Sequence, residues 1–127
     1  MSKEIRLSRT KELGDQFIAI ARIDWSSYPK FGDYDGPNTE ESDKTFDFIR
    51  QTFEGLNKND AWQDLSWHTY TSIEPQIQNA LSTYNQFLNS PNQSSFQNYA
   101  QHLDSLAYQL RISGVPFLSY DGTYIEK

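Results

Sequence analysis

The sequence predicts a mainly α-helical protein, a small antiparallel helical bundle of four to five helices with a C-terminal β-hairpin-like tail. Apolar residues recur at steps of three and four over most of the chain, which is the spacing of one helix face. The 127 residues are typical of one domain. The chain has no cysteine, so neither disulfides nor thiolate-held metals can stand in for a hydrophobic core. We therefore expect residues 1–127 to form a single helical domain.

The first segment is compatible with two structures. Four apolar residues have helical spacing: Leu13, Phe17, Ile20 and Ala21. Ser8 is a candidate N-cap for such a helix. Residues 17–25 are also apolar enough for a buried strand, and Gly14 weakens a helix by about 1 kcal/mol. We favour the helix, because the rest of the chain offers it helical partners and few strands.

Two helices are predicted in the middle of the chain. The first carries an apolar stripe made of Phe46, Ile49, Phe53 and Leu56. Thr39 or Ser42 is its candidate N-cap. A shorter helix opens at Asp60, which forms a capping-box pattern with Gln63. We expect it to run almost directly into the next helix, with a break near residue 71.

The last two helices have the clearest patterns. Ser72 is the candidate N-cap of one, which places Pro75 in a first turn where proline is tolerated. Ser90 is the candidate N-cap of the other, with Pro91 at the first helical position and Gly114 at the end. The two apolar stripes consist of Ile73, Ile77, Ala80, Leu81, Tyr84, Phe87 and Leu88, and of Phe96, Tyr99, Leu103, Leu106 and Leu110. Their short link predicts antiparallel packing.

Two segments lack helical spacing. Residues 26–38 contain two glycines and two prolines, which indicates a long aromatic, Gly/Pro-rich loop. Residues 115–127 contain Asp121-Gly122 between alternating residues. This dipeptide is a strong hairpin signal, so we predict a β-hairpin or tail there.

The charges are unevenly distributed. Nine acidic and three basic residues lie between Asp33 and Asp64, and no Lys or Arg lies between Asn59 and Leu110. Binding to nucleic acid requires a basic stripe that displaces counterions, so a nucleic-acid partner is unlikely on this pattern. We find no apolar stretch of the length of a signal peptide or a membrane helix. We expect a cytoplasmic protein with no membrane partner.

The chain lacks the familiar catalytic motifs. It has no Gly-x-Ser-x-Gly sequence, no phosphate-binding glycine loop and no His-x-His pair. Asp64 and His68 are four residues apart on the predicted short helix, where they can touch. An aspartate that orients a histidine is the start of a catalytic or metal site. No third ligand lies nearby, so we predict neither a metal nor a cofactor.

Aromatic content is the most unusual property of the chain. It has three Trp, eight Tyr and eight Phe but few aliphatic residues, more rings than one small core is expected to enclose. Trp and Tyr are the residues that most often anchor partners. The candidate partner-binding residues form two groups: Trp25, Tyr28, Phe31, Asp33, Tyr34 and Asp35, and Trp62, Trp67 and His68.

Three hypotheses of function follow. The first is a non-catalytic protein-binding module of inhibitor, immunity or adaptor type, which uses an aromatic and acidic surface to bind another protein. The second is a helical bundle with an aromatic-lined pocket for a small molecule or cofactor. The third is a small enzyme that uses Asp64 and His68. Formation of a homo-oligomer through the stretch without Lys or Arg is a further hypothesis.

Overall fold

The computed structural model describes residues 2–28 and 39–113. These residues form four α-helices: α1 (Lys3–Ala19), α2 (Thr39–Lys58), α3 (Trp67–Asn89) and α4 (Gln93–Ile112). Two short 3-10 turns, η1 (Trp25–Ser27) and η2 (Trp62–Asp64), lie in the connections. The described residues contain no strand, so the prediction of a small helical bundle is confirmed. The predicted hairpin at 115–127 and residues 29–38 of the predicted loop lie outside the described residues.

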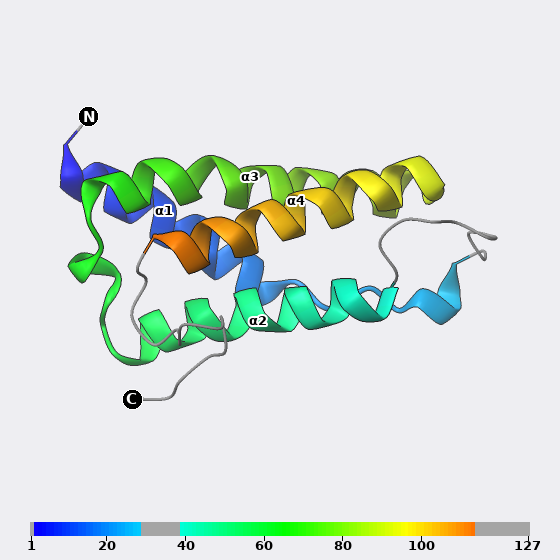
Figure 1. Cartoon of the computed structure of the whole chain (residues 1–127), viewed down its shortest axis with the longest axis horizontal. Coiled ribbons are helices and arrows are strands. Elements are labelled where there is room, and N and C mark those ends of the chain that lie inside the picture. The colour runs from blue at the N-terminus through cyan, green and yellow to red at the C-terminus, as the bar shows by residue number, and fades with distance from the viewer. Residues whose placement is uncertain (1, 29–38, 114–127) are drawn as a thin grey trace.

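The helices pack as a ring in which α1 contacts α3, α3 contacts α4, α4 contacts α2, and α2 contacts α1 (Figure 1). The predicted antiparallel packing of the last two helices is confirmed, since Phe87 near the end of α3 meets Phe96 near the start of α4. α1 and α2 are antiparallel too, but α1 runs parallel to α3, and α2 runs parallel to α4. The connection at residues 59–66 therefore carries the chain across the diagonal of the bundle, from α2 to α3.

The core consists of the predicted apolar stripes. All four stripe residues of α2 and all five of α4 are buried. On α3 the buried members are Ile73, Ile77, Ala80 and Phe87, whereas Leu88 is exposed. α1 contributes Phe17, which packs on Phe46 and Phe53 with ring centroids 5.0 and 5.8 Å apart. Contacts between rings of different helices thus fill much of the space that aliphatic residues would otherwise occupy.

The first segment is helical, as favoured, but its limits differ from the prediction. α1 begins after Ser2, whose side chain accepts a hydrogen bond from the Ile5 amide at 3.2 Å, and not at Ser8. The helix ends at Ala19, and Ile20 is already extended. Ile23 is nevertheless buried, because the extended segment after α1 still lies against the core.

Two further predicted caps are wrong. α3 begins after Ser66, whose hydroxyl accepts from the Thr69 amide, so Ser72 and Pro75 lie inside the helix. α4 begins after Asn92, and not after Ser90. Asn92 accepts from the Ser95 amide at 2.9 Å, while the Ser95 hydroxyl accepts from the Asn92 amide at 3.0 Å. This reciprocal pair is a capping box, which satisfies two amides at once and fixes the start of the helix after Asn92.

Candidate functional site

Trp25 and Trp67, one from each predicted aromatic group, lie at opposite ends of the bundle. Trp25 contacts Phe87 near the end of α3, whereas Trp67 is the first residue of that helix. Twenty residues of α-helix span about 30 Å, so the two tryptophans do not share one site. Phe31, Asp33, Tyr34 and Asp35 lie outside the described residues.

Trp25 and Tyr28 are partly buried against the core. The Trp25 ring lies 5.6 Å from Phe87 and 5.2 Å from Phe96, and Tyr28 lies 5.0 Å from Phe87. The Trp25 indole also donates a hydrogen bond to Asp43 Oδ1 at 3.1 Å. Both rings therefore help to close this end of the bundle, and only part of each remains for a partner.

Trp62 is a core residue, which corrects the expectation that its ring is surplus to the core. It is 2% exposed, stacks on Phe53 at 5.5 Å and donates from its indole to Asn57 Oδ1 at 2.7 Å. Its backbone carbonyl accepts a hydrogen bond from the Tyr70 hydroxyl. Burial raises the pKa of Tyr70, and the negative charge of nearby Asp64 raises it by a smaller amount. The diagonal connection therefore packs Trp62 against Gly14 of α1 and Phe53 of α2.

The predicted Asp64–His68 pair is not formed. Asp64 ends the turn η2, and Ser66 starts α3 anew, so the two residues do not share a helix turn. Both side chains are exposed, and no hydrogen bond or ion pair joins them in the described part of the chain. His68 remains beside Trp67 as an exposed side chain.

The acidic face of α2 is largely paired within the protein. Arg22 lies 3.5 Å from Asp47 and 4.0 Å from Asp43, and Arg50 lies 3.1 Å from Asp47. Near the start of the helix, Glu40 pairs with Lys44 at 3.4 Å. These pairs lower the negative potential of the segment, so the described acids are less available to a basic partner than the composition suggests.

A different set of side chains meets where α1 and α3 start. Trp67 is 37% exposed, and the guanidinium of Arg6 lies over its ring at 5.4 Å. The same guanidinium donates to Glu74 Oε2, and the Glu74 side chain is only 5% exposed. Arg9 Nε lies 3.7 Å from the other oxygen, Oε1. We refer to Arg6, Arg9, Trp67 and Glu74 as the seam cluster.

The seam cluster is held by charge and by packing. A buried carboxylate is costly unless cations and hydrogen-bond donors surround it. Arg6 supplies the hydrogen bond to Glu74 and also covers one face of Trp67, a cation–π arrangement. The indole is thereby fixed in place while more than a third of its surface stays exposed.

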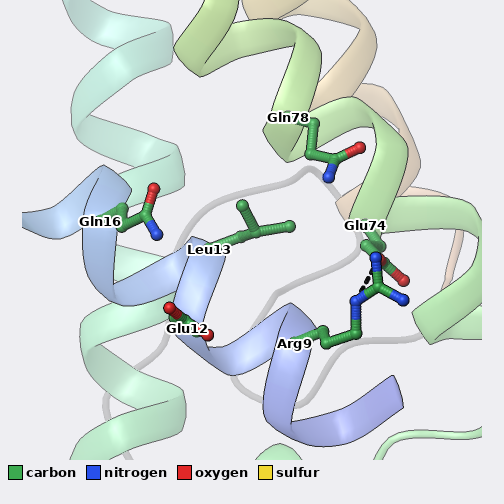
Figure 2. A pocket seen from close by; sticks show the side chains of 6 residues that line it. All are labelled: Arg9, Glu12, Leu13, Gln16, Glu74 and Gln78. Carbon is green, nitrogen blue, oxygen red and sulfur yellow. Dashed lines mark ion pairs between the residues drawn. The ribbon is translucent and has the colours of Figure 1, made fainter. Parts of the chain in front are cut away.

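A small pocket opens next to the cluster, between α1 and α3 (Figure 2). Its volume is about 140 Å³, the space of four to five waters. Its lining is mostly polar and consists of Arg9, Glu12, Leu13, Gln16, Glu74 and Gln78. No aromatic ring is among these residues, in contrast to the aromatic-lined pocket of the second hypothesis.

Arg6, Arg9 and Glu74 are absent from the residues that the sequence singled out. The signal in the sequence is Glu74 itself, the only charged residue between Asp64 and Asp104. It falls between Ile73 and Ile77 on the apolar side of its helix, where a carboxylate needs a buried partner. The partners are 65 and 68 residues away, so helical spacing alone cannot identify them.

The described residues contain neither a metal-binding group nor a helix able to span a membrane. Within residues 2–28 and 39–113, no three His, Asp or Glu side chains are grouped so as to hold a metal ion. None of the described helices combines the length and apolar content that crossing a bilayer requires. No known protein-family model, curated protein or solved structure matches the chain. Its function has therefore to be inferred from its own side chains.

Proposed function

We propose that the chain is a non-catalytic protein-binding module and that Trp67 anchors its partner. The observation that carries the proposal is a tryptophan that is 37% exposed while Arg6 and Glu74 hold it in place. Trp and Arg are the residues most enriched among binding hot spots. A fixed aromatic ring also loses little conformational freedom on binding.

Of the residues predicted for partner binding, Trp67 and His68 are the most accessible described members. Trp25 and Tyr28 contact the core, and Trp62 is enclosed by it. The binding surface is therefore centred on the starts of α1 and α3, with Ile5, 53% exposed, as a further apolar residue at the start of α1.

The two other hypotheses have less support in the geometry. The pocket beside Glu74 is well below the roughly 300–1,000 Å³ of sites for cofactors and drug-sized ligands. The enzyme hypothesis needs Asp64 to orient His68 in a concave site, and the two side chains are separate and exposed. Neither observation supports a function other than binding.

The test uses a photo-crosslinking amino acid placed at position 68 of the full chain, where the exposed His68 side chain lies next to Trp67. A crosslinked protein is identified, purified and titrated against Trp67→Ala. Loss of a hot-spot tryptophan costs about 2 kcal/mol or more, so we expect Kd to rise about 30-fold. Urea unfolding of the variant verifies that the bundle is intact.

Tyr108→Ala is the matched control. Tyr108 is an aromatic residue on α4 and is 57% exposed, more than Trp67. We expect the Kd of this variant to stay within about threefold of the original value. The proposal is wrong if the two substitutions weaken binding equally, or if Trp67→Ala leaves Kd unchanged.

A further inference from the structure

We propose that the end of α4 is a docking site for the segment that follows it in the same chain, residues 114–127. The site consists of Tyr108 and Ile112 with Arg111 beside them, and we refer to these three residues as the α4 patch. The proposal goes beyond the function proposed above and does not depend on it. It rests on the exposure of the patch, the composition of the segment and the place where the segment begins.

The α4 patch is an apolar surface on a polar side of its helix. Tyr108 and Ile112 are 57% and 58% exposed, more than any other large hydrophobic side chain of the described residues. They are four residues apart, so their side chains are neighbours on one helix face. Gln101 and Ser105, earlier on the same face, are polar and exposed. The exposed apolar surface is therefore confined to the end of α4.

The structure around the end of α4 is well anchored. The guanidinium of Arg111 lies over the Phe48 ring at 4.7 Å, and Phe48 packs against the core. The Ser113 carbonyl accepts a hydrogen bond from the Thr69 hydroxyl at 3.3 Å, which ties the end of α4 to α3. Residues 114–127 therefore begin at a fixed point, directly beside Ile112.

The segment has a composition that favours burial. Only three of its fourteen residues are charged, and six are large apolar or aromatic residues: Val115, Phe117, Leu118, Tyr120, Tyr124 and Ile125. Segments that stay solvated are typically poor in such residues and rich in charge. Contact of Phe117 and Leu118 with Tyr108 and Ile112 would remove apolar surface of both partners from water, which is favourable.

The patch is within reach of the first apolar residues of the segment. Tyr108 precedes Ile112 by four residues, about 6 Å along the helix axis. Five residues of extended chain reach about 17 Å beyond Ser113, so Phe117 and Leu118 can return to both side chains. A short tether also gives an effective concentration in the millimolar range, so a few contacts are enough for docking.

Two other arrangements fit the structure less well. A second copy of the chain needs an interface of roughly 800 Å² on each partner, whereas one aromatic side chain offers about 150–250 Å². Docking of the segment on Trp67 is disfavoured by direction. Thr69 faces the end of α4, and residue 67 lies about 200° around the helix from residue 69. Trp67 therefore points away from the place where the segment begins.

The first test measures nuclear Overhauser effects by NMR in the full, unmodified chain. We expect contacts between Tyr108 or Ile112 and the side chains of Phe117 or Leu118. A mixture of isotope-labelled and unlabelled chains assigns each contact to one chain or to two. Contacts that occur only between chains would overturn the proposal, and so would contacts of the segment with Trp67 in place of the patch, or the absence of any contact with the patch.

The second test follows chymotrypsin cleavage after Phe117 by mass spectrometry. The protease needs the segment undocked, so the cleavage rate reports the undocked population. We expect Ile112→Gln, which removes an apolar contact and keeps helix propensity, to speed cleavage about fivefold. Leu88→Gln is the matched control, because Leu88 is 39% exposed at the opposite end of the bundle, and it should leave the rate unchanged. Equal rates in the two variants would contradict docking on α4.

Discussion

Gly14 allows Trp62 to lie against α1. A Cβ atom at position 14 would lie 2.7 Å from Trp62 Cη2 and 2.8 Å from Cζ2, closer than carbon atoms approach without displacement. The indole cannot easily move away, since it stacks on Phe53 and is hydrogen-bonded to Asn57. At this position close packing outweighs the helix propensity that an alanine would add.

Gly14→Ala should therefore destabilise the protein. Alanine adds up to about 1 kcal/mol of helix propensity, but overpacking costs about 1–3 kcal/mol, so we expect a net loss of about 1–2 kcal/mol in urea unfolding. Ser8→Ala, on the exposed side of the same helix, should be neutral or slightly stabilising. A Gly14→Ala protein more stable than the original would show that Trp62 is not packed as described.

Asp104 is expected to lower stability at neutral pH. Burial against the bundle, followed by the nearby Glu41, raises the pKa of Asp104, while Arg111 and Thr45 oppose the shift. An acid with a raised folded-state pKa binds its proton more tightly when folded. The protonated carboxyl therefore contributes its full stabilisation below about pH 4. This contribution is lost as the pH rises through the pKa of the folded state.

Asp104→Asn should consequently raise the thermal midpoint at pH 7 and leave it unchanged at pH 3. The carboxylate is exposed enough for solvent to screen it, so the gain is a few tenths of a kcal/mol. Scanning calorimetry at both pH values measures the difference. A lower midpoint at pH 7 would mean that the contacts with Arg111 and Thr45 dominate.

Among the elements, α4 begins at a different residue from the one its sequence pattern suggests. Ser90-Pro91 resembles a helix start, but Asn92 and Ser95 cap each other's amides two residues later. Asn92→Ala should cost about 1 kcal/mol, the usual value for loss of an N-cap. Ser90→Ala should stay within about 0.5 kcal/mol. A larger loss of unfolding free energy in Ser90→Ala than in Asn92→Ala, measured by denaturant unfolding, would place the start of the helix at Ser90.

Pro75 lies inside α3, nine residues into the helix. A proline there has no N–H for the Thr71 carbonyl, and interior prolines cost about 3 kcal/mol. Pro75 is exposed, so Pro75→Ala removes little packing and should stabilise the protein by about 1–3 kcal/mol, reduced by the greater freedom of the unfolded chain. Unchanged or lower stability in urea would mean that the bundle depends on a bend at this residue.

At the scale of the whole molecule, the sequence predicts local features better than long-range ones. The stripes from Phe46 to Leu56 and from Phe96 to Leu110 identify two helices and their buried faces, because both are set by neighbours along the chain. The spacing of apolar residues along the chain does not predict the diagonal connection. It depends on Trp62 reaching Gly14 and Tyr70, contacts that have no periodic signature.

The candidate site is predicted only in part for the same reason. Trp67 and His68 are singled out by residue type, and the structure leaves both exposed. Arg6 and Glu74 are 68 residues apart, and their pairing follows from the parallel packing of α1 on α3. Trp25 and Trp62 belong to the same residue class as Trp67, but Trp62 is buried in the core and Trp25 packs against it.

The molecule thus places the acidic side chains of α2 and the exposed Trp67 on different faces. The acids of α2 pair with nearby arginines, whereas Trp67 stands at the opposite side, over the start of α3. From this arrangement we infer that a protein partner binds at the starts of α1 and α3.

Amide hydrogen exchange with and without the crosslinked partner tests that claim most directly. We expect protection to increase in residues 3–9 and 67–75, and to stay unchanged in residues 24–28 and 39–47. Protection confined to the second pair of segments would contradict the claim, because it would place the partner on Trp25 and the acidic face of α2.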